Sequence, residues 1–160
     1  MNSTQSTSGG ARVRFPPPVV FLALVVVGVI LQRALWPLAI PLGFWKRIGI
    51  GAVVLLAGLS SIISARIWFT RTGQSPIPWK PSPELLVQGI YRHTRNPMYV
   101  GVTVIQMGLG VLLDNLWISM LAPVALALVH FIAVRPEEAY LAEKFGDSYL
   151  RYKASVRRYL

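Results

Sequence analysis

The sequence predicts an all-α, multi-pass integral membrane protein. Hydrophobic residues make up 54% of the 160-residue chain and charged residues only 14%, a balance outside that of ordinary soluble domains. The hydrophobic residues gather in four nearly uncharged runs that approach bilayer length. These runs cover residues 15–31, 48–65, 98–113 and 116–134. We therefore expect a helical bundle with four main transmembrane helices.

The first run follows residues 1–14, which have too little apolar surface to fold and are expected to be disordered. A signal peptide is the competing interpretation of residues 15–31, but no small-residue cleavage site follows them, so we expect a retained helix. The second run, 48–65, is interrupted by small Gly and Ser residues, which let transmembrane helices approach closely.

The third run, 98–113, and the fourth, 116–134, flank Asp114 and Asn115, which predicts a tight hairpin. At about 1.5 Å per residue, each run can cross most of a hydrocarbon core about 30 Å thick. We treat residues 15–160 as a single membrane domain.

Positive charges predict the orientation of these helices. Lys and Arg are frequent between the second and third runs and after the fourth, whereas the Asp114 turn has none. By the positive-inside rule, both basic segments and the N-terminus lie in the cytoplasm and the Asp114 turn lies outside. Arg33, Lys46 and Arg47 do not fit this orientation, because they would lie on the outer side.

Composition also narrows the possible partners. The net charge of +10 is carried mostly between and after the apolar runs, where anionic lipid headgroups explain it, so we expect a bilayer and no nucleic acid. The chain has no cysteine, which excludes disulfides, thiolate metal sites and a cysteine nucleophile. We expect no metal.

Two polar segments are expected to meet at the cytoplasmic face. The loop 70–97 is rich in proline, which predicts an extended path, and loops of this length are usually functional. The segment 136–158 has apolar residues at steps of three and four, which predicts an amphipathic helix or two helices hinged near Gly146. Glu137 and Glu138 lie at its start. They either begin a helix after Pro136 or hold a polar or cationic ligand opposite Arg92, Arg95 and Asn96.

Both polar segments resemble a known family. "GIYRHTRNPMYVG", residues 89–101, is similar to the Gly-x-Tyr and Arg-His-Pro-x-Tyr-x-Gly motif of the isoprenylcysteine carboxyl methyltransferase and phospholipid methyltransferase superfamily. "RPEEAYLAEKFGDSYLRYKASVRR", residues 135–158, resembles the acidic pair of the same superfamily followed by its Phe-Gly-x-x-Tyr-x-x-Tyr pattern. The two motifs occur in the family's order, and each adjoins a predicted crossing.

The resemblance implies an enzyme of the methyltransferase class. The family binds S-adenosylmethionine between the last two crossings and the C-terminal segment, transfers methyl to a lipophilic substrate from the bilayer, and releases S-adenosylhomocysteine. Its cofactor contacts carry over to Pro83, Glu84, Leu85, Leu86, Tyr91, Asn96, Pro97, Met98, Tyr99 and Glu137. Asn96 stands where the family usually has His. Because Asn does not titrate near pH 7, we interpret this position as cofactor binding.

The catalytic residues expected are Arg135 and Glu138. A carboxylate acceptor, such as that of an isoprenoid or another lipid, needs no base and requires only a cation such as Arg135 to orient it. An amine acceptor would need a base, and Glu138 is among the few available. The resemblance places the protein in the bacterial inner membrane, with its active site facing the cytoplasm.

Other function classes stay open at the level of the sequence. Sterol reductases resemble this superfamily in fold, so an NADPH-dependent membrane reductase is one alternative. A small transporter or a non-enzymatic scaffold is another. A transporter would be expected to carry an ionisable residue deep in its first crossings, and residues 15–31 have none.

Overall fold

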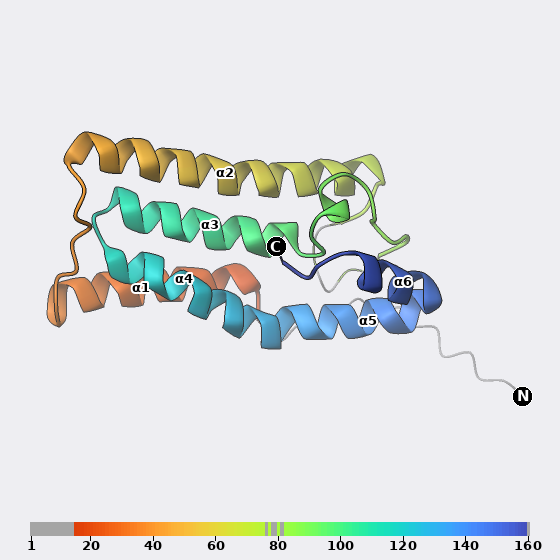
Figure 1. The fold of residues 1–160 in the computed structure, drawn as a ribbon. Coiled ribbons are helices and arrows are strands. Elements are labelled where there is room, and N and C mark those ends of the chain that lie inside the picture. The colour runs from red at the N-terminus through yellow and green to blue at the C-terminus, as the bar shows by residue number, and fades with distance from the viewer. Residues whose placement is uncertain (1–14, 76, 78–79, 81, 160) are drawn as a thin grey trace, which may run out of the picture.

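The computed structural model describes residues 15–75, 77, 80 and 82–159. Residues 1–14, which were expected to be disordered, lie outside the described residues. Within the described residues every regular element is helical, as predicted (Figure 1). The elements are α1 (Pro17–Ala34), α2 (Phe44–Arg71), η1 (Gly89–Arg92), α3 (Pro97–Leu112), α4 (Leu116–Val129), η2 (His130–Val134), α5 (Arg135–Phe145) and α6 (Asp147–Ser155).

Three helices are long and apolar enough to cross a membrane. They are α1, α2 and the continuous helix Leu116–Phe145, with mean hydropathies of 2.0, 2.2 and 2.1. The chain is therefore an integral membrane protein by the length and hydropathy of its helices. α3 is apolar but has only 16 residues, or about 24 Å of helix. A fourth full crossing at residues 98–113 thus stays a prediction.

The helices form an antiparallel bundle in which α3 packs between α2 and α4, and α1 packs against α4 (Figure 1). Glycines allow the closest approaches. A Cβ added to Gly58 of α2 would lie 2.6 Å from the Gly101 carbonyl oxygen of α3, and one added to Gly28 of α1 would lie 2.7 Å from the Ile118 side chain of α4. These contacts confirm that Gly58 serves helix packing, and they give Gly28 the same role.

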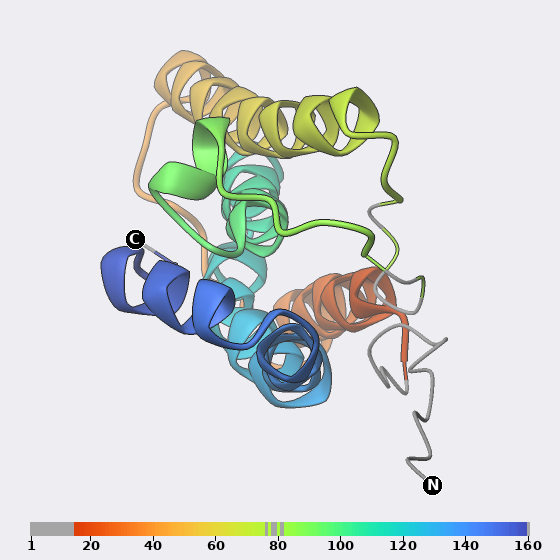
Figure 2. The same cartoon turned by 90° about the vertical axis from the view of Figure 1, so that its right-hand side faces the viewer.

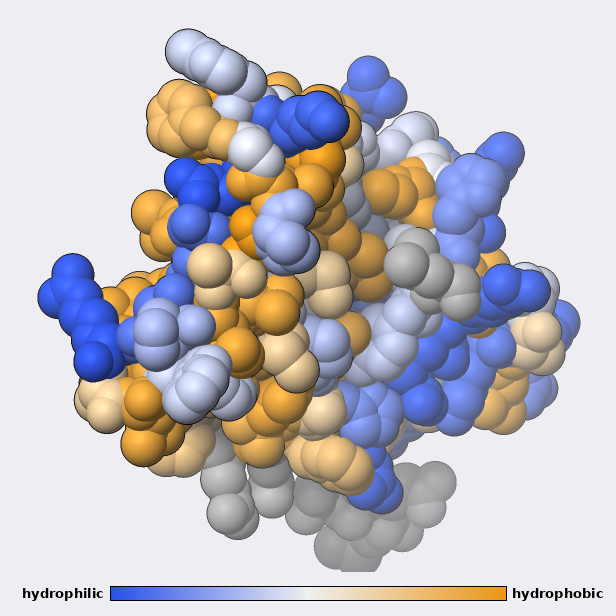
Figure 3. Space-filling view, turned by 60° about the vertical axis from the view of Figure 1, so that its left-hand side comes forward, coloured by the Kyte–Doolittle hydropathy of each residue, from blue (hydrophilic) through white to orange (hydrophobic). Residues whose placement is uncertain are grey.

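Large hydrophobic side chains cover the outside of the bundle. Val53 and Leu56 of α2, Leu22 of α1 and Phe131 of η2 are all more than 60% exposed. Figure 3 shows hydrophobic side chains over the helical body, with hydrophilic ones towards its two ends. Such an apolar surface is expected where helices face lipid, because its side chains contact hydrocarbon chains there and not water.

The turn between α3 and α4 is closed by Asp114, whose backbone is left-handed (φ 56°). Its carboxylate accepts a hydrogen bond from the Ile40 backbone N–H (2.9 Å) and pairs with the Arg47 guanidinium. The Gln32 side chain donates to the Asp114 carbonyl (3.2 Å). Arg47, one of the cations that did not fit the predicted orientation, therefore has a counter-ion at this end of the bundle.

Replacing Asp114 with Asn should lower the melting temperature slightly at neutral pH. Asn tolerates the left-handed turn and keeps an acceptor for Ile40, but it loses the charge that pairs with Arg47. The Ile40 hydrogen bond and the Arg47 guanidinium lower the pKa of Asp114 below 3.8. Because folding lowers the pKa of Asp114, its carboxylate stabilises the fold at pH values above its pKa in the unfolded chain. This stabilisation is lost as the pH falls through its pKa in the folded protein. The difference between variant and wild type in thermal unfolding should therefore shrink below about pH 4; a constant difference would contradict this.

The helix that carries the acid pair does not begin at Pro136. η2 is a π-helical turn in which the Arg135 N–H donates to the His130 carbonyl, and the backbone is helical on both sides of it. The wider turn accommodates Pro136, which has no N–H to donate. Glu137 and Glu138 therefore lie in the first turn of α5, as expected, but this turn continues directly from the helical backbone of η2.

The C-terminal segment contains two helices in place of the single helix over 136–158. α5 ends at Gly146, whose positive φ of 50° turns the chain, and α6 follows from Asp147 to Ser155. Residues 156–159 then run back towards the start of α3 (Figure 1). The sequence had allowed a hinge near Gly146, and the structure places the break at that residue.

Candidate functional site

The two polar segments come together at one end of the bundle. Viewed from this end, η1 and the preceding loop, α5 and α6, and the start of α1 surround the mouth of the bundle (Figure 2). They enclose a cavity of about 370 Å³. This volume lies within the range of small-molecule sites, about 300 to 1,000 Å³.

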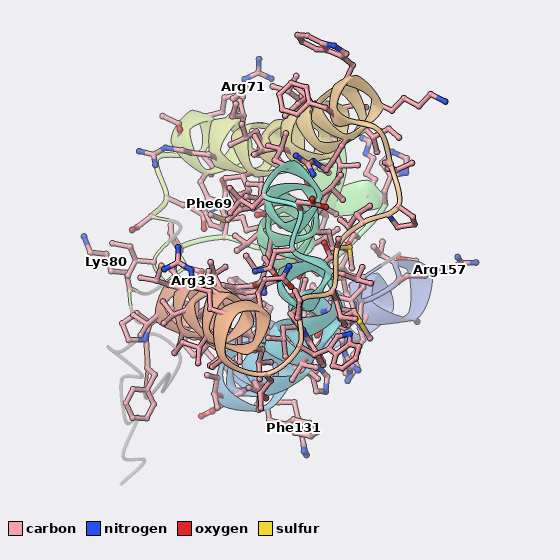
Figure 4. The ribbon with its side chains drawn as sticks, turned by 90° about the vertical axis from the view of Figure 1, so that its left-hand side faces the viewer. Arg33, Phe69, Arg71, Lys80, Phe131 and Arg157 are labelled. Carbon is pink, nitrogen blue, oxygen red and sulfur yellow. The ribbon has the colours of Figure 1, made fainter. Side chains whose placement is uncertain are left out.

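The cavity has one apolar and one polar side. Phe21 of α1, Phe69 of α2 and Val102 of α3 contribute apolar surface from the membrane-crossing part of the bundle. The side chain of Phe69 lies on the inner side of α2 (Figure 4). Arg95 and Glu137 contribute charge from the loop and from α5. The arrangement suits an amphipathic occupant, or a polar and an apolar occupant side by side.

Most of the residues expected at the site do line this cavity. Of the expected cofactor contacts, the cavity wall includes Glu84, Leu85, Leu86, Tyr91, Asn96, Pro97, Met98, Tyr99 and Glu137. Pro83 is not among the lining residues. Of the two expected catalytic residues, Glu138 lines the cavity and Arg135 does not.

Glu137 connects α5 to α3. The Tyr99 hydroxyl donates to one oxygen of the Glu137 carboxylate, at 2.5 Å. Tyr99 lies in the first turn of α3, two residues after Pro97, which begins the helix. The expected pairing of the tyrosine motif with the acidic pair is therefore a direct contact within the cavity wall.

Glu138 is held in a cluster of two arginines. Arg158 donates to both of its carboxylate oxygens at 2.9 Å, and Arg95 Nη1 lies 3.2 Å from one of them. The side chains of Arg95 and Glu138 are only 8% and 10% exposed. A carboxylate bound in this way by two guanidinium groups is held in its charged form and fixed in place. This position favours a structural role over that of a free base.

Arg135 lies away from the site. It is exposed, and its guanidinium carbon lies 5.8 Å from the ring centroid of Phe131, which points outward from the bundle (Figure 4). The helical path through η2 sets this direction, since it turns Arg135 to the outer surface while Glu138 turns inward. Arg95, which was expected to face the acid pair across a ligand, is the arginine that lines the cavity.

The side chain of Asn96 binds the C-terminal segment. Its Nδ2 donates to the Arg158 carbonyl at 3.0 Å, and its backbone N–H donates to Thr94 Oγ1 at 3.2 Å. Asn96 is 8% exposed and also lines the cavity. The residue at the usual His position therefore fixes the loop to the tail of the chain, as well as bordering the cavity.

Tyrosines from α6 complete the wall. Tyr152 donates its hydroxyl to the Tyr91 carbonyl at 2.7 Å, and Tyr149 is 2% exposed. Burial raises the pKa of both Tyr91 and Tyr152, so these phenols stay neutral. Tyr149 and Tyr152 were not expected as site residues. Their spacing in the tail pattern was the signal that could have found them.

Two buried polar atoms of the cavity wall have no hydrogen-bond partner within the described part of the chain. They are Arg95 Nε and Gln74 Oε1. Because a buried polar atom without a partner is costly, such atoms at a cavity surface are suited to bonding a ligand. Gln74 follows α2 directly and was not among the expected site residues.

His130, the first residue of η2, lies outside the cavity lining. Its Nδ1 is 2.9 Å from the Tyr159 hydroxyl. The contact ties the π-helical turn to the C-terminal segment, which supports a structural role.

Comparison with known proteins agrees with this architecture. A sequence model of the phospholipid methyltransferase family matches residues 45–148, which include α2 to α5 and most of the cavity wall. The chain belongs to this family. Family membership confirms the superfamily resemblance drawn from the two motifs.

Curated relatives of the family member differ in their descriptions. A protein-S-isoprenylcysteine O-methyltransferase of Schizosaccharomyces pombe is 38% identical over 72 residues, 45% of this chain and 30% of the relative. The nickel-cobalt-cadmium resistance protein NccN of Alcaligenes xylosoxydans xylosoxydans is 29% identical over 112 residues, 67% of this chain and 51% of the relative. An uncharacterized Haemophilus influenzae protein is 34% identical over 65 residues, 39% of this chain and 100% of the relative. The chain thus spans about a third of the length of the first of these relatives and about half of the second.

Proposed function

We propose that this phospholipid methyltransferase family member transfers a methyl group from S-adenosylmethionine to a lipophilic acceptor, with its site at the cytoplasmic face of a bacterial inner membrane. One observation carries the proposal. Two segments separated along the chain, the loop before Pro97 and the acid pair after Pro136, enclose a single cavity. That cavity borders both the polar end and the apolar body of the bundle.

The residues present fit the cofactor. S-adenosylmethionine would supply a methyl carbon bonded to a sulfonium, which accepts attack by a nucleophile. Its hydroxyl, amino and carboxylate groups need polar partners, and the polar residues Glu137, Arg95 and Gln74 line the cavity. Leu85, Leu86 and Tyr91 offer the apolar and aromatic surface that an adenine ring requires.

The apolar side suits an acceptor that enters from the bilayer. Phe21 and Val102 belong to membrane-embedded helices and line the same cavity as the charged residues. A lipid chain can lie against them while its polar end reaches Arg95 or Glu137. Holding the nucleophile and the methyl carbon together, with water excluded, is the main contribution expected of such a site.

Arg95 takes the role first expected of Arg135. A lipid carboxylate is ionised at neutral pH and needs orientation by a cation, which the buried Arg95 guanidinium supplies at the cavity surface. An amine acceptor would first lose a proton, and Glu137 is the carboxylate placed to accept it, because Glu138 is occupied by two arginines.

Ligand binding separates this function from the reductase and scaffold alternatives. Wild-type protein in lipid nanodiscs is expected to bind S-adenosylmethionine and S-adenosylhomocysteine in calorimetry, and to show no binding of NADPH. Incubation with radiolabelled S-adenosylmethionine and bacterial lipid extract should give a labelled lipid. Binding of NADPH alone would favour a reductase, and binding of none of the three would favour a transporter or scaffold.

A further inference from the structure

The last residues of the described chain run along the outer side of the cavity wall. The Arg95 backbone N–H donates to the Arg157 carbonyl at 3.0 Å. The Arg158 carbonyl accepts hydrogen bonds from Thr94 Oγ1 at 3.1 Å and from Asn96 Nδ2 at 3.0 Å. The tail, residues 156–159, is thus bonded to three consecutive residues of the loop that borders the cavity.

Two neighbouring arginines of this tail differ in what they contact. The Arg158 side chain forms a bidentate pair with Glu138 of α5, whereas Arg157 is exposed and points away from the bundle (Figure 4). Arg158 therefore links the tail, the loop and α5 at one point. Arg157 has the same side chain in the adjacent position and serves as a matched control.

The pair with Arg158 sets the charge of the wall. The ionisable acidic and basic side chains that line the cavity are Arg95, Glu84, Glu137 and Glu138. Glu84 is exposed, so the buried charges are those of one arginine and the two acids of α5. Arg158 lies behind the wall and offsets Glu138, so that Glu137 is left as the carboxylate available to a ligand.

We propose, building on the function above, that Arg158 is a positioning residue: it fixes Glu138 and offsets its charge, and thereby tunes how strongly the site prefers a cationic cofactor over its neutral product. S-adenosylmethionine carries one positive charge more than S-adenosylhomocysteine, on its sulfonium. The effective dielectric constant of a partly buried site is well below that of water. A change of one unit in the charge of the wall therefore alters the affinity for S-adenosylmethionine more than the affinity for S-adenosylhomocysteine.

The test compares the affinities of these two molecules in nanodiscs. In Arg158→Ala the wall loses one positive charge, and the affinity ratio of S-adenosylmethionine to S-adenosylhomocysteine should rise by about threefold or more. Glu138→Gln removes a negative charge and should move the ratio in the opposite direction. Arg157→Ala should leave the ratio as in wild type, and Arg158→Lys should keep it near that value.

The ratio distinguishes this role from simple loss of structure. Loosening of the wall lowers the affinities for both molecules together and leaves their ratio unchanged. A charge effect changes the ratio, and it does so in opposite directions in Arg158→Ala and Glu138→Gln. An unchanged ratio in Arg158→Ala and Glu138→Gln, with wild type binding both molecules, would overturn the inference and leave the proposed function intact. Wild type that binds neither molecule would overturn both.

Discussion

Replacing Glu137 with Ala is expected to weaken S-adenosylmethionine binding at least tenfold. The Glu137 carboxylate lines the cavity, is bonded to Tyr99 and is free of the arginine cluster that holds Glu138. A hydrogen bond to a charged group contributes about 1.5 to 3 kcal/mol, which corresponds to roughly a tenfold or larger change in affinity. Calorimetry with the nanodisc-embedded variant measures the loss.

Glu143→Ala is the matched control for this variant. Glu143 lies on the same helix, is exposed and is not a cavity residue, so its removal should leave the affinity unchanged. Both variants should insert and be recovered at wild-type yield. If Glu137→Ala bound S-adenosylmethionine as tightly as Glu143→Ala does, Glu137 would have no part in the site.

Replacing Gly58 with Leu should destabilise the bundle by about 1 to 3 kcal/mol or more, because overpacking at a close contact displaces the backbone. The contact is with backbone on the facing helix, the Gly101 carbonyl oxygen, which has no side-chain freedom to move aside. The expected result is a large drop in melting temperature and in the yield of monodisperse protein. Thermal unfolding in detergent with a fluorescent probe measures it.

Gly49→Leu is the control within the same helix. A Cβ at Gly49 meets nothing within 4 Å, so this substitution adds the same side chain to α2 without a clash. Its melting temperature should stay close to that of wild type. Because Leu favours the helix more than Gly does, helix propensity cannot cause a loss at either position. Equal losses at Gly49 and Gly58 would therefore show that the approach of α2 to α3 does not determine the effect.

The positions of the helices could be read from hydropathy, but their ends could not. The run 48–65 predicts the middle of α2, which the structure extends from Phe44 to Arg71. Hydropathy falls at the charged and aromatic residues of both ends, although the helix continues there. Arg47 shows why: its charge is offset by Asp114, a residue distant in sequence. Such tertiary pairing leaves no local signal.

Expected site residues lie together where they belong to one local motif. The stretch from Tyr91 to Tyr99 lies in one loop and one helix turn, and Tyr91 and residues 95–99 line the cavity. Arg135 was expected at the site but does not line the cavity. The direction of its side chain depends on the π-helical turn before it, which has no signal in the sequence. The role of Arg158 was missed since its partners lie 20 and more than 60 positions away.

The directions of the Glu137 and Glu138 side chains depend on the number of residues in the π-helical turn before them. Each α-helical residue advances the side-chain direction by about 100°, so one residue removed from or added to His130–Val134 would swing Glu137 out of the cavity and carry Glu138 away from Arg158. The number of residues in this short lipid-facing stretch is thereby constrained as tightly as their identity. Length variation among relatives should accumulate instead in the connection between α1 and α2, at the opposite end of the bundle.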